Sequence, residues 1–401
     1  MTLKVCYLTR PSTQSWKGQE LEGYVNQLSK KGYEIHIFGK TSLFKNDDRV
    51  FFHDIKINNT NSSESPHSIP RSTNSSYLTY FRDKAVRTID FIKINNKIQK
   101  IKPDIIHSFE CSNWGFKSTF LRSDAKRIVN CHGFDIYKFP FQSQLNYDMT
   151  KRALDLNDLI IIRSYEGKLF LIDKFQIPES KIIVFDGGIN LEKMPLSDFN
   201  ASTRISILKK YDLVESDLVI IINRGLRKVF WPVLNFFSIL HKLVAKDPNI
   251  KVILLKGNSD ILYPRIKKIL EKNNVLDKVR YIDEFVDYNE MLRLYSISDI
   301  SLSLPSRDNL SYVVPESLWF GCLTIISDLE QYRELFEDEK HLFFVKKDNK
   351  KDLLELFKRV ILNLGEYKHT IVPVSRDLVE KNFSNTHNFQ KMDRIYKELV
   401  T

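Results

Sequence analysis

Short, apolar, β-rich runs alternate with longer helical patterns along almost the whole 401-residue chain. This alternation is typical of parallel α/β proteins, in which each strand is followed by a crossover helix. The runs are almost continuously hydrophobic, as expected of strands that are covered on both faces. In the first half, strands are expected at 4–8, 34–38, 104–109, 127–132, 158–164 and 181–187, with helices near 19–31, 77–101, 144–156 and 165–174.

The same alternation then starts again. The second series places strands at 217–224, 251–257, 278–284, 300–306 and 323–328, with helices near 232–245, 261–273, 288–296, 314–320 and 351–363. Strand content lapses between residues 190 and 215, which marks a boundary. Two successive βαβ halves predict two doubly wound, Rossmann-like domains, residues 1–195 and 196–384, which face one another across a cleft. A polar loop is expected at 58–76, and a last helix at about 385–401.

Composition narrows the class of protein. No run approaches the roughly 18 apolar residues of a membrane span, and the first residues read as a buried strand rather than an export signal. The four cysteines lie far apart, as free thiols of a reducing compartment would. We therefore expect a cytoplasmic protein. Its formal charge of +11 favours acidic partners, but no zinc-finger spacing or RNA-recognition signature supports nucleic acid.

The segment 303–328 carries the strongest indication of chemistry. A buried strand ends at Pro305, a loop with Asp308, Asn309 and Ser311 follows, and a helix begins near Val314 or Pro315 with Glu316 in its first turn. Ligands of open α/β sheets bind beyond the carboxyl ends of strands and beside helix N-termini. Asp308 and Glu316 are therefore predicted to lie where a nucleotide-sugar binds.

This segment resembles glycosyltransferase family 4 (glycosyl transferases group 1), whose motif E-x7-E appears here as Asp308-x7-Glu316. The family's E-A-x-A-x-G-x-P-V-I-x-S appears as Glu316-Ser-Leu-Trp-Phe-Gly321-Cys-Leu-Thr-Ile-Ile-Ser327, and residues 154–194 and 279–306 also match. The resemblance implies the GT-B fold, with an N-terminal acceptor domain, a C-terminal donor domain and a last helix that packs back on the first domain. It also implies that Glu316 binds the ribose and that Asp308 holds the transferred sugar. The amides of Asn309, Leu310 and Ser311 would line the other side of the sugar.

Positive charge is needed to stabilise the departing diphosphate, for which the family uses an Arg and a Lys. Arg224 and Arg227 follow the first strand of the second half, and guanidinium groups suit phosphate oxygens. Val229 stands where the family's Lys belongs, and Lys256, at another strand end, is a candidate replacement.

Three residues of the first half complete the candidate site. By resemblance, His132 in the segment HGFD would approach the donor sugar or phosphate, and Asp135 would reach the acceptor. Gly18 stands where the family usually has paired glycines, in a loop that would approach the donor or the acceptor.

The sequence thus predicts a retaining, hexosyltransferase-type enzyme that moves a sugar from a nucleotide-sugar to an acceptor hydroxyl. Retention and a role in bacterial cell-surface glycan or lipopolysaccharide synthesis come from the resemblance. No D-x-D occurs, so neither metal nor cofactor is expected. Two alternatives stay open: a GT-B sugar-nucleotide epimerase, and a catalytically silent nucleotide-binding subunit.

The acceptor is expected to be a glycan or a lipid-linked molecule. Residues 77–102 read as a basic amphipathic helix, which suits peripheral contact with the anionic inner face of the cytoplasmic membrane. An ordinary Rossmann helix, apolar inward and lysine-rich outward, explains the same pattern.

Overall fold

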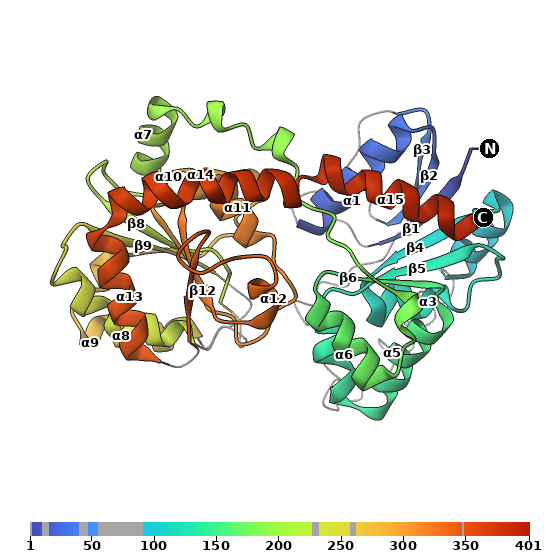
Figure 1. Ribbon diagram of the computed structural model, residues 1–401, viewed down its shortest axis with the longest axis horizontal. Coiled ribbons are helices and arrows are strands. Elements are labelled where there is room, and N and C mark those ends of the chain that lie inside the picture. Colours follow the sequence, from blue (N-terminus) through green and yellow to red (C-terminus); the bar gives the residue numbers. More distant parts are fainter. Residues whose placement is uncertain are drawn as a thin grey trace, which may run out of the picture.

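A computed structural model describes residues 2–9, 16–39, 47–54, 91–226, 232–256, 262–346 and 349–401. It contains two parallel sheets with helices on both faces, so the predicted class, two doubly wound α/β units of the GT-B type, is confirmed (Figure 1). The predicted polar loop at 58–76 and residues 77–90 of the basic helix lie outside the described residues.

The first sheet has seven strands in the order β3-β2-β1-β4-β5-β6-β7. Their bounds are β1 Lys4–Leu8, β2 Glu34–Gly39, β3 Val50–Asp54, β4 Ile105–Phe109, β5 Lys126–Asn130, β6 Leu159–Ile162 and β7 Ile182–Val184. The edge strand β3 was not predicted from the sequence. Its Phe51 is 43% exposed, so this strand lacks the continuous burial that marked the others.

The second sheet has six strands in the order β10-β9-β8-β11-β12-β13. Their bounds are β8 Leu218–Ile222, β9 Ile250–Leu255, β10 Val279–Ile282, β11 Ile300–Ser303, β12 Leu323–Ser327 and β13 Phe343–Val345. In each sheet the strand order reverses once, between β1 and β4 and between β8 and β11. Such a reversal opens a crevice at the carboxyl ends of the two strands, which is where ligands of these sheets bind.

Helices cover both faces of each sheet (Figure 1). In the first half they are α1 Trp16–Lys30, the π-helix η1 Glu110–Gly115, α3 Phe116–Ser118, α4 Phe134–Tyr137, η2 Phe139–Gln142, α5 Gln144–Leu156 and α6 Tyr165–Phe175. The short η3 Glu179–Lys181 lies between α6 and β7, and the connection to the second half carries η4 Leu191–Lys193 and η5 Leu196–Asp198. The second half has α7 Ala201–Lys210, α8 Val233–Val244, α9 Leu262–Lys272, η7 Leu276–Lys278, α10 Tyr288–Ile297, α11 Val313–Trp319, α12 Glu330–Arg333, α13 Lys350–Leu362 and α14 Leu364–Phe383. The last helix is α15 Asn385–Val400.

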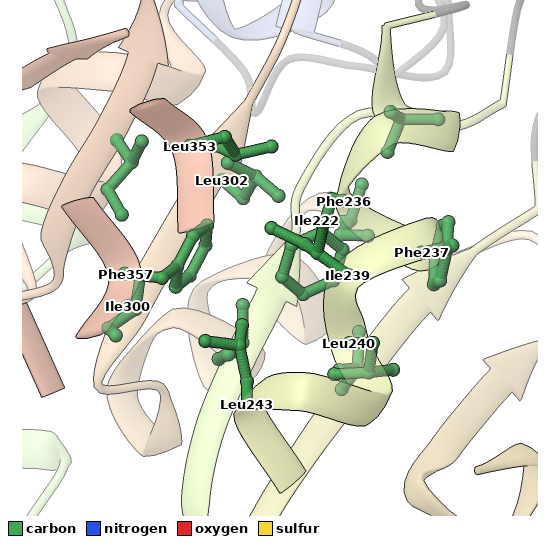
Figure 2. Close-up of a cluster of buried hydrophobic side chains, with 14 of the residues drawn as sticks. Ile222, Phe236, Phe237, Ile239, Leu240, Leu243, Ile300, Leu302, Leu353 and Phe357 are labelled. Atoms are coloured by element: carbon green, nitrogen blue, oxygen red, sulfur yellow. The ribbon is translucent and has the colours of Figure 1, made fainter. Parts of the chain in front are cut away.

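Apolar side chains from the second sheet and from two covering helices form one core of the second half. Figure 2 shows Ile222, Ile300 and Leu302 of the strands beside Phe236 and Leu240 of α8 and Phe357 of α13, all buried. Burial of each such side chain is worth about 1.5–3 kcal/mol. This core fixes the strands whose carboxyl ends carry the candidate site.

The chain crosses between the halves twice, and the two crossings touch. Ile189 and Ser384 form a parallel bridge, with the Ile189 N–H donating to the Phe383 carbonyl at 2.7 Å and the Asn385 N–H donating to the Ile189 carbonyl at 3.0 Å. Beyond this point α14 gives way to α15, which runs along the first half (Figure 1). Phe389, Met392 and Tyr396 of α15 are buried in the core around β1.

The described part of the basic segment packs as an ordinary sheet-covering helix. Ile94 and Ile98 are buried in the core that also contains Cys6 and Ile106, whereas Ile92 is 52% exposed. Within the described residues, no helix is both long enough and apolar enough to cross a membrane.

Candidate functional site

Arg224 and Asp308 meet at the crevice of the second sheet. Arg224 follows β8, Asp308 lies in the loop after β11, and these two strands are neighbours. Two nitrogens of the guanidinium contact the two carboxylate oxygens, one pair at 3.2 Å and the other closer. The Arg224 and Asp308 side chains are only 18% and 12% exposed, which strengthens their attraction. The two residues that the sequence assigned to the diphosphate and to the sugar thus form one unit.

Asp308 is held from several sides. The Tyr332 hydroxyl donates to its carboxylate, the Asn309 N–H donates to Oδ1 at 3.0 Å, and the Gln331 amide donates to its backbone carbonyl at 2.7 Å. Burial alone would raise the pKa of Asp308, but the charge and hydrogen bonds of Arg224, with those of Tyr332 and the Asn309 N–H, lower it below the ordinary value. Asp308 is therefore an anion in this site.

The loop after Asp308 has a constrained backbone. Leu310 has φ +47°, a left-handed conformation that is unusual for a residue with a side chain, and it is buried. The Ser311 N–H donates to the Tyr332 hydroxyl at 3.1 Å, so this hydroxyl connects Ser311 to Asp308. Strain of this kind is found mainly where the surrounding structure enforces a functional geometry.

Glu316 lies in the first turn of α11, as the sequence predicted, and is 4% exposed. Burial raises the pKa of Glu316 to about 8, although a hydrogen bond with Tyr288 opposes the shift. A hydroxyl-rich ligand that hydrogen-bonds to this carboxylate would compensate for its desolvation.

The raised pKa of Glu316 makes stability depend on pH. The folded protein keeps a proton that the unfolded chain releases, so the free energy of unfolding falls as pH rises from about 4.5 to about 8. Glu316→Gln, which is neutral throughout, should lack this loss. We expect the midpoint of thermal unfolding of the variant to match wild type near pH 5 and to exceed it at pH 8.5. If the unfolding midpoints of variant and wild type differed by the same amount at both pH values, the raised pKa of Glu316 would be contradicted.

Polar atoms without partners surround the same crevice. Among the described residues, the Tyr295 hydroxyl, Ser303 Oγ and Asn223 Oδ1 are buried and have no hydrogen-bond partner. Asn223 and Ser303 stand at the ends of β8 and β11, and the charges of Glu316 and Arg224 both act on Tyr295. Each unsatisfied buried group costs about 1–3 kcal/mol, so a polar ligand at this place would be favoured.

His132 and Asp135 lie at the carboxyl edge of the first sheet, after β5. The His132 ring is half-buried and stacks with Phe109 of β4 at 6.2 Å between centroids. Asp135 is 1% exposed, and its two carboxylate oxygens accept backbone N–H groups of Cys111 and His132 at 2.8 Å each. The structure therefore gives Asp135 the role of fixing the His132 loop, and contact of Asp135 with an acceptor stays a prediction.

The other candidates are placed less centrally. Lys256 follows β9, is exposed, and pairs with Asp283 at 2.7 Å. Gly18 lies in the first turn of α1 and not in the loop that was expected to precede this helix. Arg227 lies outside the described residues. In the described ranges, no group of three or more His, Cys, Asp or Glu side chains is arranged to hold a metal ion.

The sequence missed the tyrosines of the site. Tyr332 contacts Asp308, whereas Tyr288 and Tyr295 border Glu316. Tyr332 follows β12, so its place near the end of a buried strand was the available signal. Tyr288 and Tyr295 lie on α10, where aromatic residues at helical spacing are expected to be core residues.

Comparison with known families agrees with this geometry. The family described as glycosyl transferase 4-like matches residues 4–164, and glycosyl transferases group 1 match residues 230–372. Together they cover most of the chain. The chain belongs to the family 4-like, group 1 glycosyltransferases. It is therefore a transferase, as the sequence predicted. No curated protein matches it at the sequence level.

Solved structures share the fold at low identity. A glycosyltransferase from Rickettsia africae has a TM-score of 0.74 at 17% identity, over 100% of this chain and 99% of that one. The Anabaena protein HepE in complex with UDP-glucose has a TM-score of 0.73 at 11% identity, over 99% and 100%. A putative UDP-N-acetylglucosamine 2-epimerase from Listeria monocytogenes has a TM-score of 0.62 at 13% identity, over 98% and 95%. These likenesses place the glycosyltransferase in the GT-B fold.

Proposed function

We propose that this glycosyltransferase binds a nucleotide-sugar at the carboxyl ends of β8 and β11 and transfers the sugar, with retention, to an acceptor hydroxyl. The observation that carries the proposal is the Arg224–Asp308 pair where the strand order reverses, together with the buried Glu316, since the charges of Arg224 and Glu316 both act on Tyr295. Three buried polar atoms without partners in the described chain lie around it. The structure of HepE with UDP-glucose supports the class of donor.

Each group has a chemical role in this proposal. Glu316 accepts hydrogen bonds from the ribose hydroxyls, and Asp308 accepts them from the sugar. Arg224, with Arg227 and Lys256, stabilises the diphosphate as the bond between the sugar C1 and the phosphate oxygen breaks. The bonding electrons leave with the diphosphate. The acceptor oxygen bonds to C1 from the same face, and its proton passes to the departing phosphate. His132 borders the sugar from the opposite domain.

The assignment of Glu316 is tested by binding of free UDP, which contains a ribose and no sugar to be transferred. Glu316→Ala should weaken UDP binding about 10- to 150-fold, the effect of losing about 1.5–3 kcal/mol of hydrogen bonding. Asp308→Asn, which keeps the shape of the side chain, should weaken it less. Isothermal titration calorimetry measures both. Unchanged UDP affinity in Glu316→Ala would remove the assignment.

The proposed chemistry needs no metal ion, because arginine and helix N-termini stabilise the diphosphate. We expect transfer to persist at wild-type rate in excess EDTA. Complete inactivation that only Mg²⁺ or Mn²⁺ reverses would contradict the metal-independent mechanism.

For the acceptor we propose a glycan or lipid-linked hydroxyl in bacterial cell-surface synthesis, reached from the cytoplasmic face of the membrane. The chain's charge of +11 supports contact with anionic lipid, to which each basic residue close to the membrane surface contributes about 1 kcal/mol. Sedimentation with anionic but not neutral liposomes, reversed by salt, is the expected result. A protein that stays in solution with both would favour a soluble acceptor.

A further inference from the structure

The loop that carries Asp308 is attached to the opposite half of the molecule. Arg307 lies over the rings of Tyr137 and Phe170, at 4.3 and 4.9 Å from their centroids, and 4.0 Å from Glu166. All three partners belong to α4 and α6 of the first half. A planar guanidinium is attracted to the faces of aromatic rings on which it stacks.

Asn309, the next residue but one, is inserted between two strand ends of the first half. Its amide nitrogen donates to the Cys131 carbonyl at 3.3 Å, and its oxygen accepts from the Ser164 hydroxyl at 3.2 Å. Asn309 is 5% exposed. Gly133 faces it with φ +101°, and a Cβ at Gly133 would lie 3.2 Å from the Cβ of Asn309. The Asn309 side chain thus forms hydrogen bonds that join the two domains.

Glu334 makes a third attachment. Its two carboxylate oxygens accept the backbone N–H groups of Tyr165 and Glu166 at 2.9 Å each, at the N-terminus of α6. A carboxylate is favoured at this end of a helix. Glu334 immediately follows α12, whose Gln331 and Tyr332 hold the Asp308 carbonyl and carboxylate. The contact with α6 is therefore connected to Asp308 through one short helix.

We infer that Arg307, Asn309 and Glu334, here called the interdomain clasp, are positioning residues that hold the Asp308 loop in its working place by attaching it to the first half. The inference rests on the proposed function, in which Asp308 binds the sugar. If the clasp holds the Asp308 loop, the position of this sugar-binding residue depends on contacts with both domains. Glu316 and Arg224 lie outside the clasp. Loss of the clasp should therefore impair transfer of the sugar much more than binding of the nucleotide.

The test compares Glu334→Ala with Glu330→Ala, which changes an exposed glutamate at the start of α12, the helix that Glu334 follows. In the nucleotide-free protein, Glu334→Ala should speed amide hydrogen exchange of Tyr165 and Glu166 about 10-fold or more, and exchange in the 307–311 loop should rise with it. Glu330→Ala should leave both unchanged. Unaltered exchange in Glu334→Ala, or an equal rise in both variants, would overturn the clasp.

The effect on the reaction is measured with UDP and UDP-glucose. Glu334→Ala and Asn309→Ala should keep UDP affinity within about 2-fold of wild type. Both should lower kcat about 10-fold or more, whether for sugar transfer or for the slow hydrolysis of UDP-glucose. Glu330→Ala should change neither quantity. Equal losses of UDP affinity and kcat would reduce these residues to a general structural role and overturn the inference. Failure of the wild type to bind any nucleotide would count against the proposed function instead, and the exchange experiment would still decide the clasp.

Discussion

Arg224→Lys should lower the rate of sugar transfer about 100-fold or more while the protein remains folded. A lysine keeps the positive charge beside buried Asp308, but one ammonium group cannot contact both carboxylate oxygens and a phosphate as the planar guanidinium can. Steady-state kinetics with the preferred nucleotide-sugar measure the loss, and circular dichroism checks the fold.

The matched control is Arg293→Lys, whose side chain is 55% exposed and lies 3.2 Å from Glu290. An ion pair with such an exposed arginine contributes about 1 kcal/mol or less, so this variant should transfer sugar at the wild-type rate. An Arg224→Lys enzyme as active as the control would show that the Arg224–Asp308 pair is not part of the reacting site.

Gly188→Ala should lower the midpoint of thermal unfolding by about 5 °C or more, or prevent folding. Gly188 has φ +76°, and a Cβ at this position would stand 2.4 Å from the Phe383 carbonyl oxygen and 2.9 Å from the Asn385 nitrogen. Both atoms take part in the hydrogen bonds that join the two crossings. Backbone atoms cannot move aside as a flexible side chain does, so the substitution must separate the crossings.

Gly365→Ala is the control for this substitution. Gly365 lies in α14, and an added Cβ there meets nothing within 4 Å. Alanine favours a helix over glycine by up to about 1 kcal/mol, so the unfolding midpoint should stay the same or rise. Equal destabilisation by both substitutions would contradict the role given to the contact between the crossings.

The sequence predicted the parts of the fold that local pattern determines. Strands β8, β11 and β12 are buried, and β8 and β12 are rich in β-branched residues, so the strand ends, and with them the places of Arg224, Asp308 and Glu316, were predicted closely. Helix α14 was not predicted, because Pro373 lies inside it and its apolar positions give a weak pattern. Strand β13 is only three residues long, too short for periodicity to reveal.

What the sequence could not show is which side chains meet. Arg224 and Asp308 are 84 positions apart, and their contact follows from the strand order, which places β8 beside β11. Asn309 was expected to line the donor through its backbone amide, but its side chain bonds to residues 164 and 131 of the other half. Contacts between domains produce no periodic pattern of residues in the sequence of either segment. The resemblance suggested Asp135 for the acceptor, which stays a prediction, and the sequence did not show that its carboxylate accepts two backbone N–H groups.

The central claim, that this chain transfers a sugar from a nucleotide-sugar bound beside Arg224, Asp308 and Glu316, is tested most directly by one measurement. Saturation-transfer NMR with UDP-, GDP-, ADP- and CMP-sugars, followed in the same samples over time, reports both binding and reaction. The account predicts that one base is selected, that its ribose protons are saturated most strongly, and that free nucleoside diphosphate and released or transferred sugar accumulate. It also predicts that Glu316→Ala loses the ribose signal. Accumulation of an epimerised donor, binding without any turnover, or no binding to any member of the panel would contradict it.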